Sequence, residues 1–272
     1  MACGAWVLDT AVSTTDAGSR SATRQAAAMR TRTSATRSAM DGGAEAGEEG
    51  VMNLPAGYSA EARALWDVAT ALNRAAAAVS PRAAALPPLL FFTDPARTPR
   101  PWATAARLPA GSAVVFRAFG ASDAVETGRR LRAATRTAGA KLLVGLDLDL
   151  ARAVQADGLH LPERAAAAAP ALRAAWPGAL MTAAWHGTTA APVLGLDALI
   201  LSPVFPAGGA SADRPPLGVD GFTAEARRAA LPVYALGGID AKTADGLTAS
   251  GACGLAGVAA IQAAFAEPAI RT

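Results

Sequence analysis

The sequence has little cysteine, little lysine and little charge overall. Its two cysteines, Cys3 and Cys253, are too few and too far apart for a disulfide framework, so we expect a protein of the reducing cytoplasm. No purely apolar run approaches the roughly 18 residues that would span a bilayer, so we expect no membrane partner. Charged residues make up 17% of the 272 residues and hydrophobic residues 52%, which excludes bulk disorder.

The basic residues are almost all arginine. Of 25 Lys and Arg residues only Lys141 and Lys242 are lysine, and 22 acidic residues leave a net charge of +3. This bias, together with abundant alanine and glycine, is typical of a GC-rich genome. The basic balance is therefore a weak argument for nucleic-acid binding, and we expect no nucleic-acid partner.

The N-terminal residues differ in composition from the rest of the chain. Between Ala17 and Met40 there are five arginines and no acidic residue. Such a segment buries almost no apolar surface, so residues 1–55 are expected to form a disordered basic tail. Two other interpretations remain open, a targeting segment and a start site at Met40 or Met52.

An accessory helix with its linker is expected over residues 56–85. Ser59 can cap the helix, and Pro81 would end it. The apolar residues expected near one face of this helix are Leu65, Val68, Leu72 and Val79.

Residues 86–266 alternate short apolar runs with helical stretches rich in Ala and Arg. The runs are Leu89–Phe92, Ala113–Arg117, Lys141–Gly145, Gly158–Leu161, Leu180–Trp185, Ala198–Val204, Pro232–Gly237 and Gly254–Ala259. Continuous apolar runs are typical of parallel strands buried on both faces. Eight such units predict an α/β fold, a single compact (β/α)8 TIM barrel. An open doubly wound sheet is the second choice, and the absence of a G-x-G-x-x-G motif after the first run counts against it.

In such a barrel the chemistry lies at the C-terminal ends of the strands. Gly237 and Gly238 end the seventh run before a helical stretch, where backbone N–H groups could bind a phosphate. The turn with Val258 and Ala259 after the eighth run would supply the other half of this phosphate site. A plain tight turn is the competing interpretation of the glycine pair.

Four further residues at strand ends are candidates for the chemistry. His186 follows the fifth run and can exchange a proton near neutral pH, so it is the predicted catalytic residue. Arg117 ends the second run and needs an anionic partner, either a substrate or an acid such as Asp94. Thr93 and Ser202 are expected to contact substrate. A second histidine, His160, is flanked by apolar residues and is interpreted as structural.

No metal site is expected from the residues. The two histidines are isolated, the cysteines are distant, and no carboxylates occur at ligand spacing. The long loop from Ser202 to Ser211 has no Lys or Arg, so it is poorly suited to hold a pyrophosphate.

The order of these elements resembles the thiamine phosphate synthase/TenI family, whose members are compact (β/α)8 barrels that act on phosphorylated thiazoles of thiamin biosynthesis. The resemblance covers residues 89–261 in four ordered blocks. These blocks are Leu89–Asp94, Ala156–Leu161, Leu201–Pro206 with the later Pro216–Gly218, and Val233–Ile239.

The departures from the family fall on the residues that hold pyrophosphate and Mg²⁺. In the family's Gln-Leu-Arg-x-Lys motif, which corresponds to Val115–Phe119, only Arg117 is kept. The family's metal-binding Asn-Asp pair corresponds to Gly145-Leu146, and its second metal-binding Asp corresponds to Ala165. Its Thr-Pro-Thr-Lys loop corresponds to Ala207–Ala210. The loss of these charges removes several kcal/mol of transition-state stabilisation for a departing pyrophosphate, on the order expected for such groups.

The resemblance therefore implies the TenI branch, whose acid/base histidine follows the fifth strand, as His186 does. We expect isomerisation of a phosphorylated thiazole by proton transfer without a cofactor. One alternative is a thiamine phosphate synthase that uses Mg²⁺ held by Asp94 or Asp147. Another is a non-catalytic barrel that binds a phosphorylated metabolite. The expected partner is a phosphorylated thiazole or thiamin phosphate, and a homo-oligomer is left open.

Overall fold

A computed structural model describes residues 54–187, 190–209 and 212–266. Residues 1–53, which make up nearly all of the predicted basic tail, lie outside the described residues, as does Cys3. Among the described residues, no helix combines the length and the apolar character that crossing a bilayer requires.

Eight parallel strands close into a barrel in chain order, with β8 paired to β1. The strands are β1 (Leu89–Phe92), β2 (Ala113–Phe116), β3 (Lys141–Gly145), β4 (Gly158–Leu161), β5 (Leu180–Trp185), β6 (Ala198–Leu201), β7 (Val233–Leu236) and β8 (Leu255–Gly257). Every strand falls within the apolar run that predicted it, so the predicted (β/α)8 barrel is confirmed.

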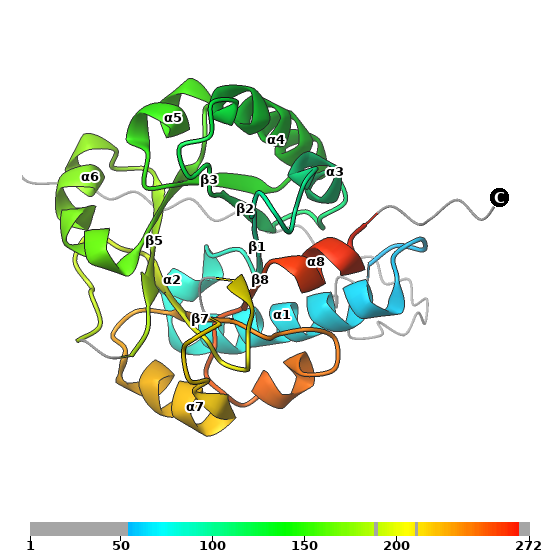
Figure 1. The fold of residues 1–272 in the computed structure, drawn as a ribbon. Helices are drawn as coiled ribbons and strands as arrows, with labels where there is room; N and C mark the ends of the chain where they lie inside the picture. The colour runs from blue at the N-terminus through cyan, green and yellow to red at the C-terminus, as the bar shows by residue number, and fades with distance from the viewer. Residues whose placement is uncertain (1–53, 188–189, 210–211, 267–272) are drawn as a thin grey trace, which may run out of the picture. The chain divides into compact units, whose positions relative to one another are not determined.

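Helices follow most strands and surround the barrel (Figure 1). The α-helices are α1 (Ala60–Val79), α2 (Pro81–Ala84), α3 (Pro101–Ala105), α4 (Ala124–Ala138), α5 (Leu148–Ala153), α6 (Ala169–Ala175), α7 (Gly218–Arg228) and α8 (Ala259–Ala264). Two short 3₁₀ helices, η1 (Glu163–Ala168) and η3 (Ala244–Leu247), follow β4 and β7. The described part of the connection from β5 to β6 contains no helix.

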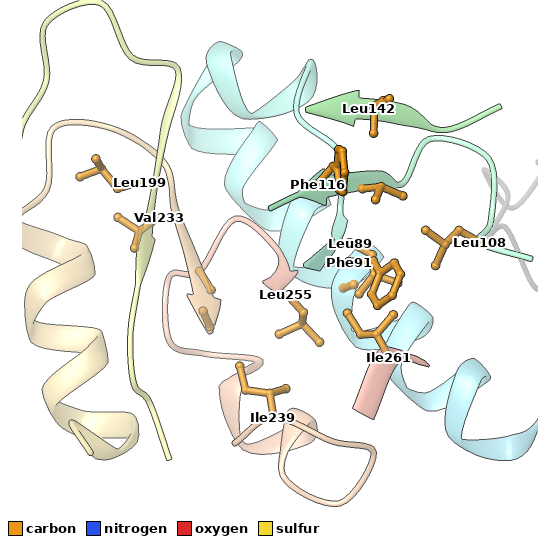
Figure 2. Close-up of a cluster of buried hydrophobic side chains, with 14 of the residues drawn as sticks. Leu89, Phe91, Leu108, Phe116, Leu142, Leu199, Val233, Ile239, Leu255 and Ile261 are labelled. Atoms are coloured by element: carbon orange, nitrogen blue, oxygen red, sulfur yellow. The ribbon is translucent and has the colours of Figure 1, made fainter. Parts of the chain in front are cut away.

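The strands bury both faces, as their continuous apolar runs predicted. Alternate residues such as Leu90, Phe92 and Val115 pack inside the barrel, where Leu86 belongs to the same cluster. The intervening residues face the helices. Figure 2 shows this outer layer, in which Leu89, Phe91, Phe116, Leu142, Leu199, Val233 and Leu255 are labelled. The barrel interior is therefore filled by side chains and is not a pore.

Helix α1 packs beside α8 on the outside of the barrel (Figure 1). The Ser59 hydroxyl accepts a hydrogen bond from the Ala62 amide and donates one to the Ala264 carbonyl, so the predicted cap also ties α1 to α8. Leu65 and Leu72 are buried as predicted. Val79, the last residue of the helix, is 85% exposed.

Two matching ion pairs secure the N-terminal face of the barrel. Asp157, just before β4, pairs with Arg132 of α4 at 2.6 Å and accepts the Leu142 amide of β3. Asp197, just before β6, pairs with Arg173 of α6 at 2.6 Å and accepts the Met181 amide of β5. Each aspartate therefore links a helix to the strand that precedes the aspartate's own strand in the barrel. These ion pairs lie at the N-terminal ends of the strands, whereas barrels of this type have their active sites at the C-terminal ends.

Candidate active site

His186 lies at the mouth of the barrel, directly after β5, and it is paired with a glutamate that the sequence analysis did not identify. The His186 Nδ1 atom lies 2.5 Å from Oε2 of Glu163, which begins η1 after the neighbouring strand β4. The His186 amide also donates to Oε1 of Glu163 at 3.3 Å. The side chains are 16% and 25% exposed. When Nδ1 carries a proton and donates it to the carboxylate, Nε2 becomes the basic nitrogen of the neutral ring.

His160 has the structural environment expected from its apolar neighbours. Its ring is buried inside the barrel, with Nδ1 3.0 Å from the Thr182 hydroxyl and the ring edge-to-face with Phe92. Burial, with a smaller contribution from the positive charge of Arg117, lowers the pKa of His160 to about 3. His160 is therefore neutral at any ordinary pH and does not supply a proton at the mouth.

Arg117 follows β2 and is held by the loop after β1. Its Nε atom donates to the Thr93 carbonyl at 2.7 Å, and its amide donates to the Thr93 hydroxyl at 3.0 Å. Asp94 Oδ2 lies 3.5 Å from Arg117 Nη2 and 2.9 Å from Arg97 Nη2. These hydrogen bonds and charges hold the pKa of Asp94 below its usual range, with the hydrogen bond from Arg97 as the largest cause.

The Arg117 cluster has an excess of positive charge, because Arg97 and Arg117 share the single carboxylate of Asp94. Arg117 Nη2 is buried and makes no hydrogen bond, since its contact with Asp94 is an ion pair without hydrogen-bond geometry. An unsatisfied buried guanidinium nitrogen is costly, so it is a candidate donor to an anionic ligand.

A cavity of about 170 Å³ opens beside this cluster, between the loops after β1 and β2. It brings together Thr93 and Arg117, two of the predicted substrate-binding residues, and its wall also includes Trp102 and Asp123. Neither His186 nor the Gly237-Gly238 turn lines this cavity. The structure therefore unites two of the predicted site residues in one cavity and places the others elsewhere on the mouth.

The Gly237-Gly238 turn follows β7 and packs tightly against the loop after β6. Gly237 has φ +103°, and a Cβ there would lie 2.8 Å from the Pro203 Cα atom. Gly238 has φ +64°, and a Cβ there would lie 2.5 Å from the Pro206 carbonyl oxygen. This packing by itself requires glycine at both positions. The glycine pair therefore does not by itself distinguish a phosphate site from a plain turn.

The amide groups around this turn are better indicators of a phosphate site than the glycines are. Within the described residues, the amides of Gly238 and Ile239 donate to no acceptor, and the same holds for Ala259 at the start of α8. Val258 and Ala259 follow β8, which pairs with β7, so the two turns lie on adjacent strand ends. Ser202 directly follows β6, which pairs with β7 on its other side. Ser202 is buried, and its amide donates to the Trp185 carbonyl at 3.2 Å.

The helical stretch expected after the glycine pair is wrong in its extent. Only η3 forms there, beginning at Ala244, because Asp240 folds the preceding residues into a turn. The Asp240 carboxylate accepts the amides of Lys242 and Thr243, and these hydrogen bonds lower the pKa of Asp240. A helix macrodipole at Gly238 is therefore not part of this site.

The carboxylates at the mouth do not fit a Mg²⁺ site. Asp94 is shared by two arginines, Asp147 caps α5 by accepting the Leu150 amide, and Glu163 holds His186. Among the described residues, no three His, Cys, Asp or Glu side chains gather as a metal would require. Mg²⁺ prefers several carboxylate and water oxygens in octahedral geometry, which this arrangement does not provide.

Sequence reasoning missed Glu163 and Arg97, the partners of two predicted residues. Glu163 comes three residues after His160 and shortly after β4, so its position at a strand end was the available signal. Its pairing with His186 depends on the barrel placing β4 beside β5. Arg97 depends on the path of the loop after β1, which no local pattern in the sequence specifies.

Comparison with known proteins identifies a family model and several proteins that are similar to this chain. Residues 89–261 match the family model described as thiamine monophosphate synthase. A Geobacter sulfurreducens protein provisionally named thiamine-phosphate synthase is 37% identical over 148 residues, which cover 53% of this chain and 68% of that protein. Thiamine-phosphate synthase of Moorella thermoacetica is 34% identical over 145 residues, which cover 52% of this chain and 69% of that protein.

A solved structure whose name describes a similar enzyme also matches this chain. Thiamine phosphate pyrophosphorylase from Pyrococcus furiosus matches with a TM-score of 0.55 and 26% identity, covering 66% of this chain and 92% of that one. The names of the relatives favour the synthase that the sequence analysis placed second over the isomerase that it placed first. The matched residues include all eight strands, and the chain therefore belongs to the thiamine monophosphate synthase family.

Proposed function

We propose that this chain is an enzyme that binds a phosphorylated thiazole at the barrel mouth and transfers a proton on it, as in the isomerisation of a thiazole carboxylate phosphate to its aromatic form. The observation that carries this proposal is the pairing of His186 with Glu163 at 2.5 Å. Such an isomerisation removes a proton at one carbon of the conjugated system and returns a proton at another. No other bond breaks, so one acid/base group suffices.

The pairing gives His186 the properties that this step needs. Glu163 accepts a hydrogen bond from the protonated Nδ1 atom. The unprotonated Nε2 atom can then take a proton from the substrate and return it. The carboxylate would also stabilise the imidazolium that exists between these two transfers. A single base therefore acts first as base and then as acid, and the step is balanced in protons.

The substrate phosphate would bind the turns after β7 and β8. Gly237 and Gly238 on one turn, and Val258 and Ala259 on the other, offer backbone N–H groups at adjacent strand ends. Barrels of this architecture often bind phosphate at this position. A phosphate held there would be anchored by hydrogen bonds that do not change during the reaction.

Arg117 would bind a second anionic group of the substrate, such as a carboxylate. Its Nη2 atom lacks a hydrogen-bond acceptor, and the pair of arginines with Asp94 is net positive. Thr93 supports this role by fixing both the backbone and the side chain of Arg117. Ser202 completes the proposed substrate contacts at the end of β6.

The second candidate function is thiamine phosphate synthesis from an aminopyrimidine pyrophosphate and a thiazole phosphate. The relatives named thiamine-phosphate synthase favour it. The arrangement of the mouth carboxylates opposes it, because each of them already has a partner in the protein.

One pair of assays separates the two reactions. In the first, the thiazole carboxylate phosphate tautomer is followed by absorbance without divalent cations, and we expect turnover. In the second, aminopyrimidine pyrophosphate, thiazole phosphate and Mg²⁺ are supplied, and we expect no thiamin phosphate. Synthesis of thiamin phosphate in the second assay with no turnover in the first would overturn the proposal in favour of the synthase.

The variant His186→Gln is the matched test of the base, because glutamine keeps a hydrogen-bonding group but carries no titrating proton. We expect it to lose on the order of 10²- to 10⁴-fold in kcat. Glu126→Gln, on the outer surface of α4, serves as the control and should keep full activity.

If neither reaction occurs but thiazole phosphate raises the melting temperature, the chain is a binding protein.

A further inference from the structure

We propose that the side of the mouth after β2 and β3 is an apolar subsite, formed by Phe119 and Leu146, that receives the planar heteroaromatic ring of the substrate. This inference rests on the proposed function, because it names the part of a phosphorylated thiazole that these two residues contact. Neither residue is among the site residues that the sequence patterns identified.

Both residues have backbone conformations that are unfavourable for their side chains. Phe119 has φ +49° and Leu146 has φ +62°. Leu146 is also the central residue of a three-residue turn, in which the Asp147 amide donates to the Gly145 carbonyl at 2.7 Å. A turn of this kind with positive φ is rare and strained. Glycine, asparagine and aspartate are favoured at such positions, whereas phenylalanine and leucine are not.

A third residue with positive φ, Gln155, owes this backbone conformation to its position at the end of a helix. Gln155 has φ +55° and closes the C-terminus of α5, where the Gln155 and Ala156 amides donate to the carbonyls of Arg152 and Ala151. A left-handed residue in that position is a common helix ending. Phe119 and Leu146 end no helix, since each lies in a loop that leads from a strand toward the next helix. Strained backbone conformations cluster at ligand-binding positions, and no helix ending accounts for the strain at Phe119 and Leu146.

The two side chains are also unusually exposed for their type. Phe119 is 69% exposed and Leu146 is 43% exposed. At these exposures, much of the apolar surface of the two side chains is not covered by the protein. A bound ring would cover that surface, which accounts for both features at once.

The two residues lie on the same part of the mouth. Phe116 and Val144 pair across β2 and β3, so the loops that follow these strands start side by side. A Cβ on Gly145 would lie 3.6 Å from the Arg117 Cγ atom, which places the start of the β3 loop against Arg117. The Arg117 guanidinium carbon in turn lies 5.3 Å from the centre of the Phe119 ring.

The charge of this region fits a ring with an anionic substituent and does not fit a metal-bound diphosphate. Arg117 is the cation beside Phe119, so a carboxylate on the ring could meet the guanidinium while the ring lies against Phe119 and Leu146. A hydrated cation such as Mg²⁺ would meet the apolar side chain of Leu146 instead of an oxygen ligand.

The test compares the binding of three probes to the full chain by calorimetry. The probes are 4-methyl-5-(2-hydroxyethyl)thiazole phosphate, ethyl phosphate (which lacks the ring) and pyrophosphate with Mg²⁺. We expect wild type to bind the thiazole phosphate at least about tenfold more tightly than ethyl phosphate, independently of Mg²⁺, because only the thiazole phosphate carries a ring that can contact Phe119 and Leu146.

The variants are Phe119→Lys and Leu146→Asp, which remove the apolar surface without removing Arg117. Aspartate tolerates the positive φ at position 146 better than leucine, so this variant should fold at least as well as wild type. Val79→Lys and Leu194→Asp are the matched controls, at apolar residues that are 85% and 73% exposed and belong to α1 and to the loop before β6. We expect the two mouth variants to lose the preference for the ring and the two controls to keep it.

Three results are distinguishable. Loss of the ring preference in the mouth variants alone supports the subsite. An unchanged preference in the mouth variants overturns the subsite and leaves the proposed function standing. Equal binding of thiazole phosphate and ethyl phosphate by wild type also overturns the subsite, whereas the proposed function is judged separately by turnover of the carboxylated tautomer.

Discussion

Glu163 and His186 follow neighbouring strands, and the glutamate carboxylate contacts the histidine twice, at Nδ1 and at the backbone amide. These two contacts fix both the ring and the backbone of His186 relative to η1. When Nδ1 carries the proton and donates it to this carboxylate, the ring has one orientation and one tautomer, which a lone surface histidine would not have.

Glu163→Gln should reduce kcat for thiazole isomerisation on the order of tenfold to a hundredfold, with little change in KM. The reason is that the amide can donate to Nδ1 as well as accept from it, so the tautomer with a basic Nε2 is no longer enforced. Steady-state kinetics measures the effect. Glu163→Asp should restore part of the activity, since it keeps the carboxylate but shortens its reach. Equal kcat for wild type and Glu163→Gln would show that the pairing has no catalytic role.

Gly238→Ala should lower the free energy of unfolding by about 2 kcal/mol or more, measured by urea denaturation. The added Cβ would lie 2.5 Å from the Pro206 carbonyl oxygen, and the residue would keep a positive φ. Gly208→Ala in the adjoining loop is the matched control, because a Cβ there meets nothing within 4 Å. The control should change stability by less than about 0.5 kcal/mol. Equal effects of the two substitutions would contradict the packing described for this turn.

The buried His160 should make the fold less stable in mild acid. Its folded pKa of about 3 lies below the unfolded value of 6.5, so in this range the unfolded chain binds the proton and the folded chain does not. The stabilising contribution is present above pH 6.5 and is lost as the pH falls toward 3. Between about pH 7.5 and pH 5 the loss should be about 2 kcal/mol.

The check on this prediction is a comparison with His160→Gln, which can still contact the Thr182 hydroxyl but does not titrate. Urea denaturation of both proteins at the two pH values isolates the contribution of His160. The variant should lose about 2 kcal/mol less stability than wild type over this interval. A parallel decline in both proteins would mean that His160 is protonated in the folded state.

The sequence contained enough information to predict the barrel, because its eight strands are continuous apolar runs buried on both faces. Leu89–Phe92, for example, is apolar at every position since alternate residues pack inside the barrel and against the helices. Helical periodicity places Val79 on the same face as Leu65 and Leu72, but it does not reveal that this last residue of α1 is 85% exposed.

The candidate site could be predicted only in part, because some contacts between its residues depend on the folded structure and not on local sequence patterns. His186 and Arg117 could be identified from their positions at strand ends, and Asp94 could be named as a candidate partner of Arg117. Glu163, which pairs with His186, and Arg97, which pairs with Asp94, were missed because strand adjacency and loop paths set these contacts. The helical stretch after Gly238 was overestimated because the Asp240 side chain, which binds local amides, competes with a regular helix.

The most direct test of proton transfer by His186 is the incorporation of solvent deuterium into the thiazole product during turnover in heavy water, followed by proton NMR. The account predicts that wild type converts the thiazole carboxylate phosphate tautomer without Mg²⁺ and carries substrate-derived hydrogen into the product, which then contains less than one deuterium per molecule. His186→Gln should not convert the tautomer above the rate in buffer. Conversion by His186→Gln at the wild-type rate, with the same deuterium content, would contradict it.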